Sequence, residues 1–124
     1  MKLKDLRIER AIVAMKADPK RRWTVQELAR LVGMSRAVFA KRFTETKGVP
    51  PLRWLTEHRL SIATAELVNG HLALAGVAEK VGYISEFAFA KAFKRLFGVA
   101  PGTFRRTSRK LGSIESIQPM MRAA

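Results

Sequence analysis

The chain has 124 residues, with 24 Lys and Arg against 10 Asp and Glu, and a formal net charge of +14 at pH 7. This length suits one ordinary domain or two very small ones that share a core, and it excludes a catalytic domain joined to a sensor domain. The charge favours a polyanionic partner, with nucleic acid ahead of an anionic membrane or an acidic protein, whereas 48% hydrophobic residues exclude a disordered basic tail.

Cysteine is absent, which excludes a disulfide framework and a thiolate metal site and permits a reducing compartment. No stretch approaches the ~18 apolar residues of a membrane span. Residues 1–10 alternate charges with Leu and Ile instead of leading into the apolar core of a signal peptide. We therefore expect a soluble, cytoplasmic protein without a membrane partner.

The first predicted helix runs from about Asp5 to Ala17. Ile8, Ile12 and Met15 recur at the spacing of one helical face and should point inward. The helix should end before Asp18-Pro19, and its expected role is to cover the structural unit that follows.

A short second helix should begin at Val25. Thr24 and Glu27 have the spacing of a capping box, which satisfies the free amides at a helix start. Gly33 should end the helix by adopting the left-handed backbone that other residues resist. Between these limits an apolar stripe at i, i+3 and i+4 should face inward: Leu28, Leu31 and Val32.

The third predicted helix follows a sharp turn, with Ser35 as its N-cap. Phe39 and Phe43 fall on one face and should be buried. Two short helices around a tight turn with glycine are typical of a helix-turn-helix unit. The opposite, outward face then carries four residues: Arg36, Ala37, Ala40 and Lys41.

A long helix should connect this unit to the rest of the chain. Pro51 suits the first turn of a helix, and no further Pro or Gly occurs before Asn69-Gly70. At 1.5 Å per residue its length is about 28 Å, close to the ~34 Å of one duplex turn. Such a spacer would suit two recognition helices in successive major grooves. We expect these of its residues in the core: Trp54, Leu60, Ala63 and Leu67.

The first unit is repeated. Residues 28–34 (LARLVGM) are echoed by residues 77–83 (VAEKVGY) at an offset of 49, and seven later positions, from Ser35 to Pro51, recur at an offset of 50. One residue is therefore inserted at the turn, and the pattern predicts a second helix-turn-helix unit. In this copy Gly82 is the turn glycine and Ser85 the cap, and the expected core residues are Val77, Ala78, Val81, Phe89, Phe93 and, after the unit, Phe104.

The second unit has a weaker entrance. Ala73 occupies the position of Thr24 and cannot cap, and Gly76 costs up to ~1 kcal/mol relative to alanine within a helix. We expect a frayed start to this helix. After Arg106 neither periodicity nor a stop signal is present, so residues 107–124 are predicted to form a flexible tail.

The sequence thus predicts an all-α fold of about seven helices. We expect a first helix-turn-helix subdomain over residues 1–50, a linker helix over 51–69 and a second subdomain over 70–106. An enzyme would need a nucleophile with its base, paired carboxylates or metal ligands at workable spacing. The two histidines, His58 and His71, have no carboxylate at such spacing. We therefore expect no catalytic residue, no metal and no cofactor.

The motifs together resemble the DNA-binding domain of the AraC/XylS transcription regulators. The resemblance runs from about Ile8 to Arg106 and couples helix spacing, the turn glycine and a closing Gly-Val-x-Pro. Its motifs are Arg59-Leu60, Ala63, Leu67, Val77-Ala78, Val81-Gly82-Tyr83, Ser85, Phe89, Lys91, Phe93-Lys94-Arg95, Phe97-Gly98-Val99, Pro101 and Phe104-Arg105-Arg106.

This resemblance implies a bacterial, nucleoid-associated regulator whose two units bind consecutive major grooves of duplex DNA. RNA polymerase would be a further partner if the protein is an activator. Most family members carry a ligand-binding or dimerising domain ahead of this one, so we expect that domain to be absent from this segment and no small-molecule ligand to bind here.

The resemblance also implies base-facing positions on the two helices that Ser35 and Ser85 open. Alanine at positions 37 and 40, where many relatives hold large polar side chains, leaves Arg36 and Lys41 as the strong donors and indicates modest direct readout. Glu86 either accepts from cytosine or favours its helix N-terminus. Phe87 either meets a base or packs on the neighbouring helix. The full set is Arg36, Ala37, Ala40 and Lys41, then Glu86, Phe87, Ala90 and Lys91.

Phosphate contacts should supply most of the affinity. No acidic residue occurs from Phe87 to Ile114, so this end of the chain is a nearly unopposed basic strip. A protein-interaction adapter and an RNA-binding domain are the alternatives; the first would not need this charge, and the second usually exposes aromatics for stacking. The predicted phosphate contacts are Arg21, Arg22, Arg42, Lys47, Lys94, Arg95, Arg105 and Arg106, although a solvated surface position is an equal alternative for each.

Overall fold

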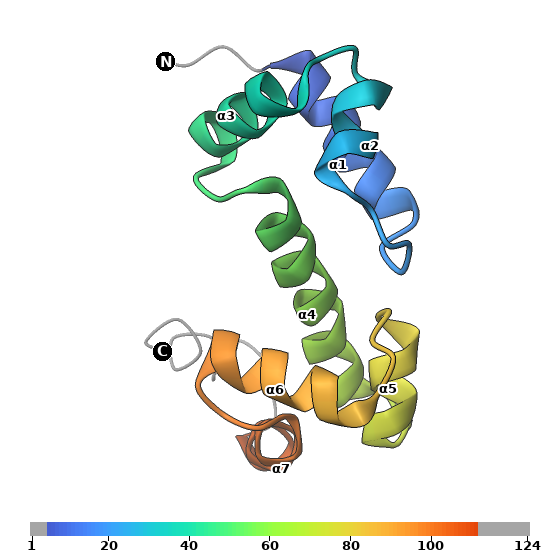
Figure 1. Ribbon diagram of the computed structural model, residues 1–124. Coiled ribbons are helices and arrows are strands. Elements are labelled where there is room, and N and C mark those ends of the chain that lie inside the picture. Colours follow the sequence, from blue (N-terminus) through green and yellow to red (C-terminus); the bar gives the residue numbers. More distant parts are fainter. Residues whose placement is uncertain (1–4, 112–124) are drawn as a thin grey trace. The chain divides into compact units, whose positions relative to one another are not determined.

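A computed structural model describes residues 5–111 of the chain, and every regular element among them is an α-helix (Figure 1). The all-α fold and the number of helices are as predicted. The helices are α1 (Leu6–Ala17), α2 (Val25–Leu31), α3 (Arg36–Lys47), α4 (Pro51–Asn69), α5 (Leu74–Lys80), α6 (Glu86–Phe97) and α7 (Pro101–Leu111).

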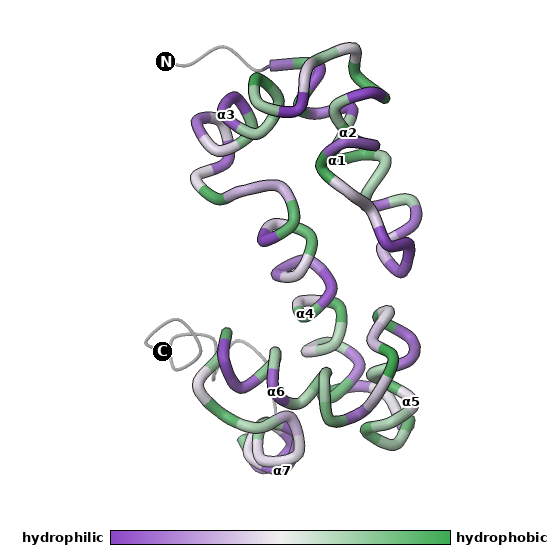
Figure 2. The backbone as a smooth tube through the Cα atoms, in the orientation of Figure 1, coloured by the Kyte–Doolittle hydropathy of each residue, from purple (hydrophilic) through white to green (hydrophobic). Residues whose placement is uncertain are grey.

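The chain divides into two compact units, and the boundary between His58 and Arg59 lies inside α4. The predicted linker helix is therefore shared between the two units. Leu55, in its first half, belongs to the core of the first unit. Leu60, Ala63 and Leu67, in its second half, belong to the core of the second, as predicted. Because polar and apolar residues alternate around the helices (Figure 2), each unit has one buried apolar interior.

The core of the first unit forms between α1, α2, α3 and the start of α4. Ile8, Ile12 and Met15 of α1 are buried, as their spacing predicted. Leu28 and Val32 are buried too, but Leu31 is 46% exposed, so the predicted stripe is wrong at this position. A seven-residue helix turns a single narrow face inward, and here Ala29 occupies that face beside Leu28.

Aromatic rings fill the centre of each unit. In the first, Phe43 contacts Phe39, with ring centroids 5.8 Å apart, and Trp54, with centroids 6.5 Å apart. In the second, Phe93 lies among three rings at 4.7–5.8 Å, which places it at the centre of that core: Phe89, Phe97 and Phe104. Edge-to-face and tilted ring pairs of this kind stabilise a core beyond their buried area.

The N-caps predicted from the sequence are present at three helices. Thr24 Oγ1 accepts from the Glu27 amide at 3.0 Å at the start of α2. The Ser35 and Ser85 hydroxyls accept from the amides three residues later, at 3.3 and 3.0 Å. These caps fix the first turns of α3 and α6 and hence the direction of their side chains.

The turn glycines also adopt the conformation predicted for them. Gly33 has φ 72° and Gly82 has φ 97°, both in the left-handed region. A β-carbon at these positions would be strained, because L-residues rarely adopt positive φ. The tight turns that present α3 and α6 therefore depend on these two residues.

The entrance to α5 lacks the cap that opens α2. Ala73 has extended backbone at the N-cap position and makes no side-chain hydrogen bond to the helix. This agrees with the sequence, although fraying itself stays a prediction.

The last helix extends further than predicted. α7 ends at Leu111, so residues 107–111 are helical, and the flexible tail cannot begin at Thr107. Ser108 is fully buried, and its hydroxyl donates to the Arg105 carbonyl at 3.1 Å. Sequence periodicity missed this turn because a serine, rather than a large apolar residue, faces the core. The rest of the predicted tail, residues 112–124, lies outside the described residues.

Candidate nucleic-acid interface

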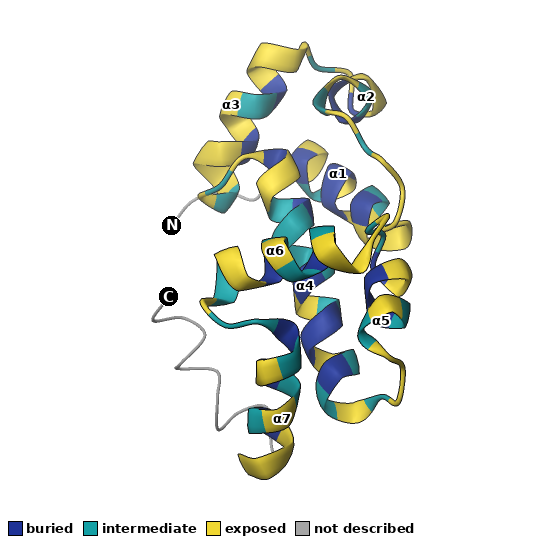
Figure 3. Ribbon diagram, turned by 60° about the horizontal axis from the view of Figure 1, so that its bottom comes forward, coloured by how far each residue is buried: buried dark blue, intermediate teal, exposed yellow. Residues whose placement is uncertain are grey.

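The outward face of α3 carries the residues that the sequence assigned to base contacts. Arg36, Ala37 and Lys41 are exposed and Ala40 is half-buried, opposite the buried Phe39. Figure 3 shows this alternation as exposed and buried segments around α3 and α6. Since Ser35 caps the helix, this face is held in a defined orientation and is open to solvent.

The outward face of α6 carries the corresponding residues. Glu86 and Lys91 are exposed and Ala90 is half-buried. Phe87 is 77% exposed, so of its two alternatives the packing on a neighbouring helix is wrong. In α6 the buried positions belong to Phe89 and Phe93, and a residue two positions before Phe89 points to the opposite side.

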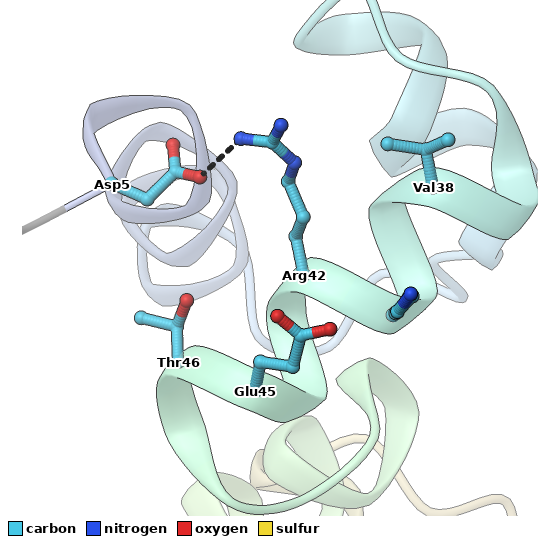
Figure 4. A pocket seen from close by; sticks show the side chains of 6 residues that line it. Asp5, Val38, Arg42, Glu45 and Thr46 are labelled. Carbon is cyan, nitrogen blue, oxygen red and sulfur yellow. Dashed lines mark hydrogen bonds and ion pairs between the residues drawn. The ribbon is translucent and has the colours of Figure 1, made fainter.

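A surface hollow of about 460 Å³ lies beside the face of α3 (Figure 4). Asp5 reaches it from the start of α1, and Arg42 spans the hollow to meet the Asp5 carboxylate at 3.5 Å. Asp5 also caps α1 by accepting from the Arg7 amide at 3.1 Å. Partial burial raises the pKa of Asp5, but the hydrogen bonds from the Arg7 and Ile8 amides and from Arg42 outweigh it and lower that pKa overall. The other residues that line the hollow are Val38, Lys41, Glu45 and Thr46.

Three of the predicted phosphate contacts make ion pairs within the first unit. Arg21 meets Glu27 at 2.7 Å, and its guanidinium also lies 4.3 Å from the centre of the Trp23 ring. Lys47 meets Glu9 at 2.6 Å. With the Arg42–Asp5 pair, these contacts neutralise part of the charge that the sequence appeared to offer to a ligand. All three pairs are partly solvent-exposed, so each is weak.

The Arg105 side chain, also predicted to contact phosphate, hydrogen-bonds to the backbone within the second unit. Its Nε donates to the Leu67 carbonyl at 3.1 Å, and its Nη2 is buried without a hydrogen-bond partner. Burial, followed by repulsion from Arg109, lowers the pKa of Arg105. Arg109 donates to the Gly70 carbonyl nearby. These two arginines satisfy carbonyls at the end of α4, where a helix leaves acceptors unpaired.

The remaining predicted phosphate contacts are exposed. Arg22 lies in the turn before α2, and Lys94 and Arg95 lie on α6. Arg106 is exposed as well, and it donates to the Thr103 hydroxyl at 3.3 Å. None of these four side chains is paired with a carboxylate among residues 5–111.

Ile84 was not assigned a role from the sequence. It lies in the turn before α6 and is 81% exposed. The change of repeat offset from 49 to 50 at this turn is the signal that marks it, because Ile84 is the inserted residue. Val38 on α3, 47% exposed, was missed for a different reason, since a β-branched residue beside buried Phe39 gives no sequence signal of exposure.

No described helix is long and apolar enough to cross a membrane. Residues 5–111 also contain no cluster of three or more His, Asp or Glu side chains that would hold a metal ion.

Comparison with known proteins identifies the arrangement. Residues 28–107 match the model of a helix-turn-helix domain family. The chain is 41% identical over 104 residues to an AraC-like transcription regulator of Streptomyces lividans, covering 84% of this chain and 34% of that protein. It is 43% identical over 105 residues to the transcriptional activator RclR of Escherichia coli, covering 85% and 37%. The chain thus spans about a third of the length of these relatives.

Solved structures agree with this result. The DNA-binding domain of AdpA, a global transcriptional factor solved in complex with a target DNA, has a TM-score of 0.79 at 27% identity, over 85% of this chain and 95% of that one. The C-terminal domain of AraT from Geobacillus stearothermophilus has a TM-score of 0.78 at 26% identity, over 83% and 86%. These relatives are transcription regulators, a non-enzymatic class. The chain belongs to the AraC family of transcription regulators and corresponds to its double helix-turn-helix domain.

Proposed function

We propose that this chain binds duplex DNA sequence-specifically and regulates transcription, with α3 and α6 as its recognition helices. One observation carries the proposal: the corresponding faces of both helices carry exposed residues, Arg36, Ala37 and Lys41 on α3 and Glu86, Phe87 and Lys91 on α6, while their opposite faces form the two cores. The similarity to a domain solved on its target DNA supports it. In this proposal the helices occupy successive major grooves of one duplex.

The base-reading roles follow from side-chain chemistry. Arg36 and Lys41 donate to the guanine N7 and O6 acceptors, and Lys91 does so from α6. Ala37, Ala40 and Ala90 allow the helix backbone to approach the bases and contact thymine methyl groups. Glu86 follows the cap Ser85, where its charge favours the helix N-terminus; accepting from cytosine is its alternative role.

Phosphate anchoring is assigned to the exposed, carboxylate-free cations. These are Arg22, Lys94, Arg95 and Arg106. Arg21, Arg42 and Lys47 contribute where a phosphate displaces their partly exposed carboxylate partners. Arg105 is excluded from the set, because its guanidinium lies against the end of α4. Four phosphates neutralised in this way give a slope of about −4 in log affinity against log salt.

The wider role is proposed from the family. The longer relatives are transcription regulators, and one of them is named as an activator. We propose that this chain acts on chromosomal DNA in the bacterial cytoplasm and that an activating form contacts RNA polymerase. Sensing of a small molecule is assigned to a region outside these residues.

A fluorescence-anisotropy titration tests the proposal. Duplexes are first selected by the protein from a pool with a randomised core, and the winning sequence is then compared with its scrambled version and with single-stranded RNA across a salt series. We expect preference for the selected duplex, and we expect Lys41→Ala to weaken that preference by about 1–3 kcal/mol.

Lys16→Ala is the matched control, because it removes the same charge from an exposed position on α1. It should leave the preference for the selected duplex intact. Equal, salt-sensitive binding of all three polyanions by the unaltered protein would contradict sequence-specific recognition and would favour a protein-interaction adapter.

A further inference from the structure

Two large apolar side chains lie exposed at the entrance to α6. Ile84 is 81% and Phe87 is 77% exposed, the largest exposed fractions among the large hydrophobic residues that the structure describes. Exposing such surface to water is unfavourable, so an exposed apolar pair beside a binding surface indicates contact with a partner.

The direction of Phe87 is fixed by the helix. At about 100° per residue, Phe87 points about 160° away from buried Phe89 and about 120° away from buried Phe93. It shares its face instead with Lys91 and Lys94, four and seven positions later, and both are exposed. Phe87 therefore projects toward whatever the two lysines bind.

The first unit lacks both features. At the position of Phe87 it has Ala37, and its turn runs from Met34 directly to Ser35, whereas the second turn contains the additional Ile84 between Tyr83 and Ser85. The two units are otherwise built alike, with the same serine cap and the same turn glycine. The fold therefore does not require either apolar side chain.

The positive charge around Ile84 and Phe87 indicates the kind of partner that they contact. From Phe87 to Leu111 the chain contains no acidic residue, and α6 carries Lys91, Lys94 and Arg95 on its exposed surface. Glu86 is the acidic residue that adjoins Phe87 in the sequence. A polyanion matches this surface, and within duplex DNA the major groove displays one apolar group, the C5-methyl of thymine.

We propose that Ile84 and Phe87 contact thymine methyl groups, so that the half-site under α6 is read by two large apolar side chains in addition to Lys91. This inference rests on the proposed function, because it presupposes that α6 enters the major groove. It assigns to the second unit contacts from two large apolar side chains that the first unit lacks.

Replacement of thymine by deoxyuridine tests the proposal, since it removes the methyl group and leaves the hydrogen-bonding edge unchanged. In the selected duplex each thymine is replaced in turn, and affinity is measured by anisotropy. For each thymine under α6 we expect a loss of about fourfold, as for one buried methyl group. In Phe87→Ala the replacement should have no effect at the thymine under Phe87 and should keep its effect at the thymine under Ile84, whereas Phe87→Leu should remain sensitive at both. Ile84→Ser should abolish sensitivity at one thymine and keep it at others.

Val13→Ser is the matched control, because Val13 is a 66% exposed apolar residue on α1. It should bind thymine and uracil duplexes as the unaltered protein does. If the replacement by deoxyuridine lowers the affinity of the unaltered protein and of Phe87→Ala equally at every thymine, the proposed methyl contact of Phe87 is wrong. A preference for the selected duplex would in that case still support the proposed function. If no duplex is selected at all, the proposed function fails as well. If light scattering shows self-association that Phe87→Ala abolishes, with uracil without effect, the pair is a protein-docking surface and the proposal is wrong.

Discussion

The two helix-turn-helix units have nearly the same interior. Phe39 and Phe43 pack with ring centroids 5.8 Å apart at 58°, and Phe89 and Phe93 pack with the same separation and angle. The recognition helices begin at a serine cap and end at a glycine with φ 83° or 81°. A duplicated unit thus keeps the contacts that build its shape.

The units differ on their surfaces and at their entrances. Ala37 corresponds to Phe87, and Thr44-Glu45 corresponds to Lys94-Arg95. The first unit is opened by the Thr24 cap, whereas Ala73 leaves the second uncapped. The buried positions that match between the copies therefore carry the fold, and the positions that differ are where the two surfaces and the two helix starts diverge.

The largest expected effect comes from the shared core. Phe93→Ala and Phe43→Ala should each lower the free energy of unfolding by about 3–5 kcal/mol, because each leaves a cavity among buried rings. The loss should be greater for Phe93, which contacts three rings where Phe43 contacts two. Urea unfolding measures both values. A smaller loss for Phe93→Ala would contradict the assignment of Phe93 as the centre of the second core.

Arg105 separates the structural cations of the second unit from those that bind DNA. Arg105→Ala should lower the free energy of unfolding by about 2 kcal/mol, since the Leu67 carbonyl loses its donor. Lys94→Ala, at an exposed position, should leave stability unchanged and reduce the salt slope of DNA binding by about 1. Stability is read from urea unfolding and the slope from anisotropy. If Arg105→Ala changes the slope and not the stability, Arg105 is a phosphate contact.

The N-cap residues of α2 and α5 can be exchanged by substitution. Thr24→Ala should destabilise the first unit by about 1 kcal/mol, and Ala73→Thr should stabilise the second by up to about 1 kcal/mol. Amide hydrogen exchange in the unaltered protein should be faster at the start of α5 than at the start of α2, and Ala73→Thr should slow it. Equally slow exchange at both starts would remove the predicted fraying.

The smallest expected difference between the two units is in their loss of stability at acidic pH. In the first unit, the Arg21 side chain, followed by the Thr24 hydroxyl, lowers the pKa of Glu27, and hydrogen bonds from the Arg7 and Ile8 amides and from Arg42 lower that of Asp5 against partial burial. Burial, followed by Lys16, lowers the pKa of His58, which stacks on Trp54 with ring centroids 5.2 Å apart.

A lowered pKa in the folded state means that the unfolded chain binds the proton more readily, so stability is lost as the pH falls. For His58 the loss begins below about pH 6.5, and for the two carboxylates below about pH 4.5. Asp5, Glu27 and His58 all lie in the first unit. Hydrogen exchange between pH 7 and 4 should show the first unit losing protection before the second, and His58→Gln should remove the earlier loss. Equal loss in both units would contradict this.

Much of the fold could be predicted because its signals are local. Each element is marked by a signal within a few residues: the Thr24 and Ser35 caps, the turn glycines or the spacing of the phenylalanines. The Ser35 cap, the turn glycine and the phenylalanine spacing occur again in the second unit. The end of α7 could not be predicted, because Ser108 has no apolar side chain to indicate burial.

For the candidate site, the sequence could predict on which side of a helix a residue lies but not which contacts its side chain makes. Periodicity places Arg36 and Lys41 outside, and the structure agrees. It cannot distinguish Arg105 from Arg106, because the contact with the Leu67 carbonyl joins residues 38 positions apart. Sequence alone left Phe87 open between contact with a base and packing on a neighbouring helix, because the packing around an aromatic residue on an amphipathic helix is not written in its periodicity; the structure shows the side chain exposed.

Exchange of the two outward faces is the most direct test of the claim that these faces read DNA. Four substitutions, Glu86→Arg, Phe87→Ala, Lys94→Thr and Arg95→Glu, give α6 the residues of α3 at the exposed positions 36, 37, 44 and 45 and leave its buried phenylalanines unchanged. Selection from randomised duplexes should then return a changed half-site under α6 that is closer to the half-site under α3, while the thymine under the retained Ile84 persists. An unchanged selected sequence, in a variant that circular dichroism shows to be folded, would contradict the account.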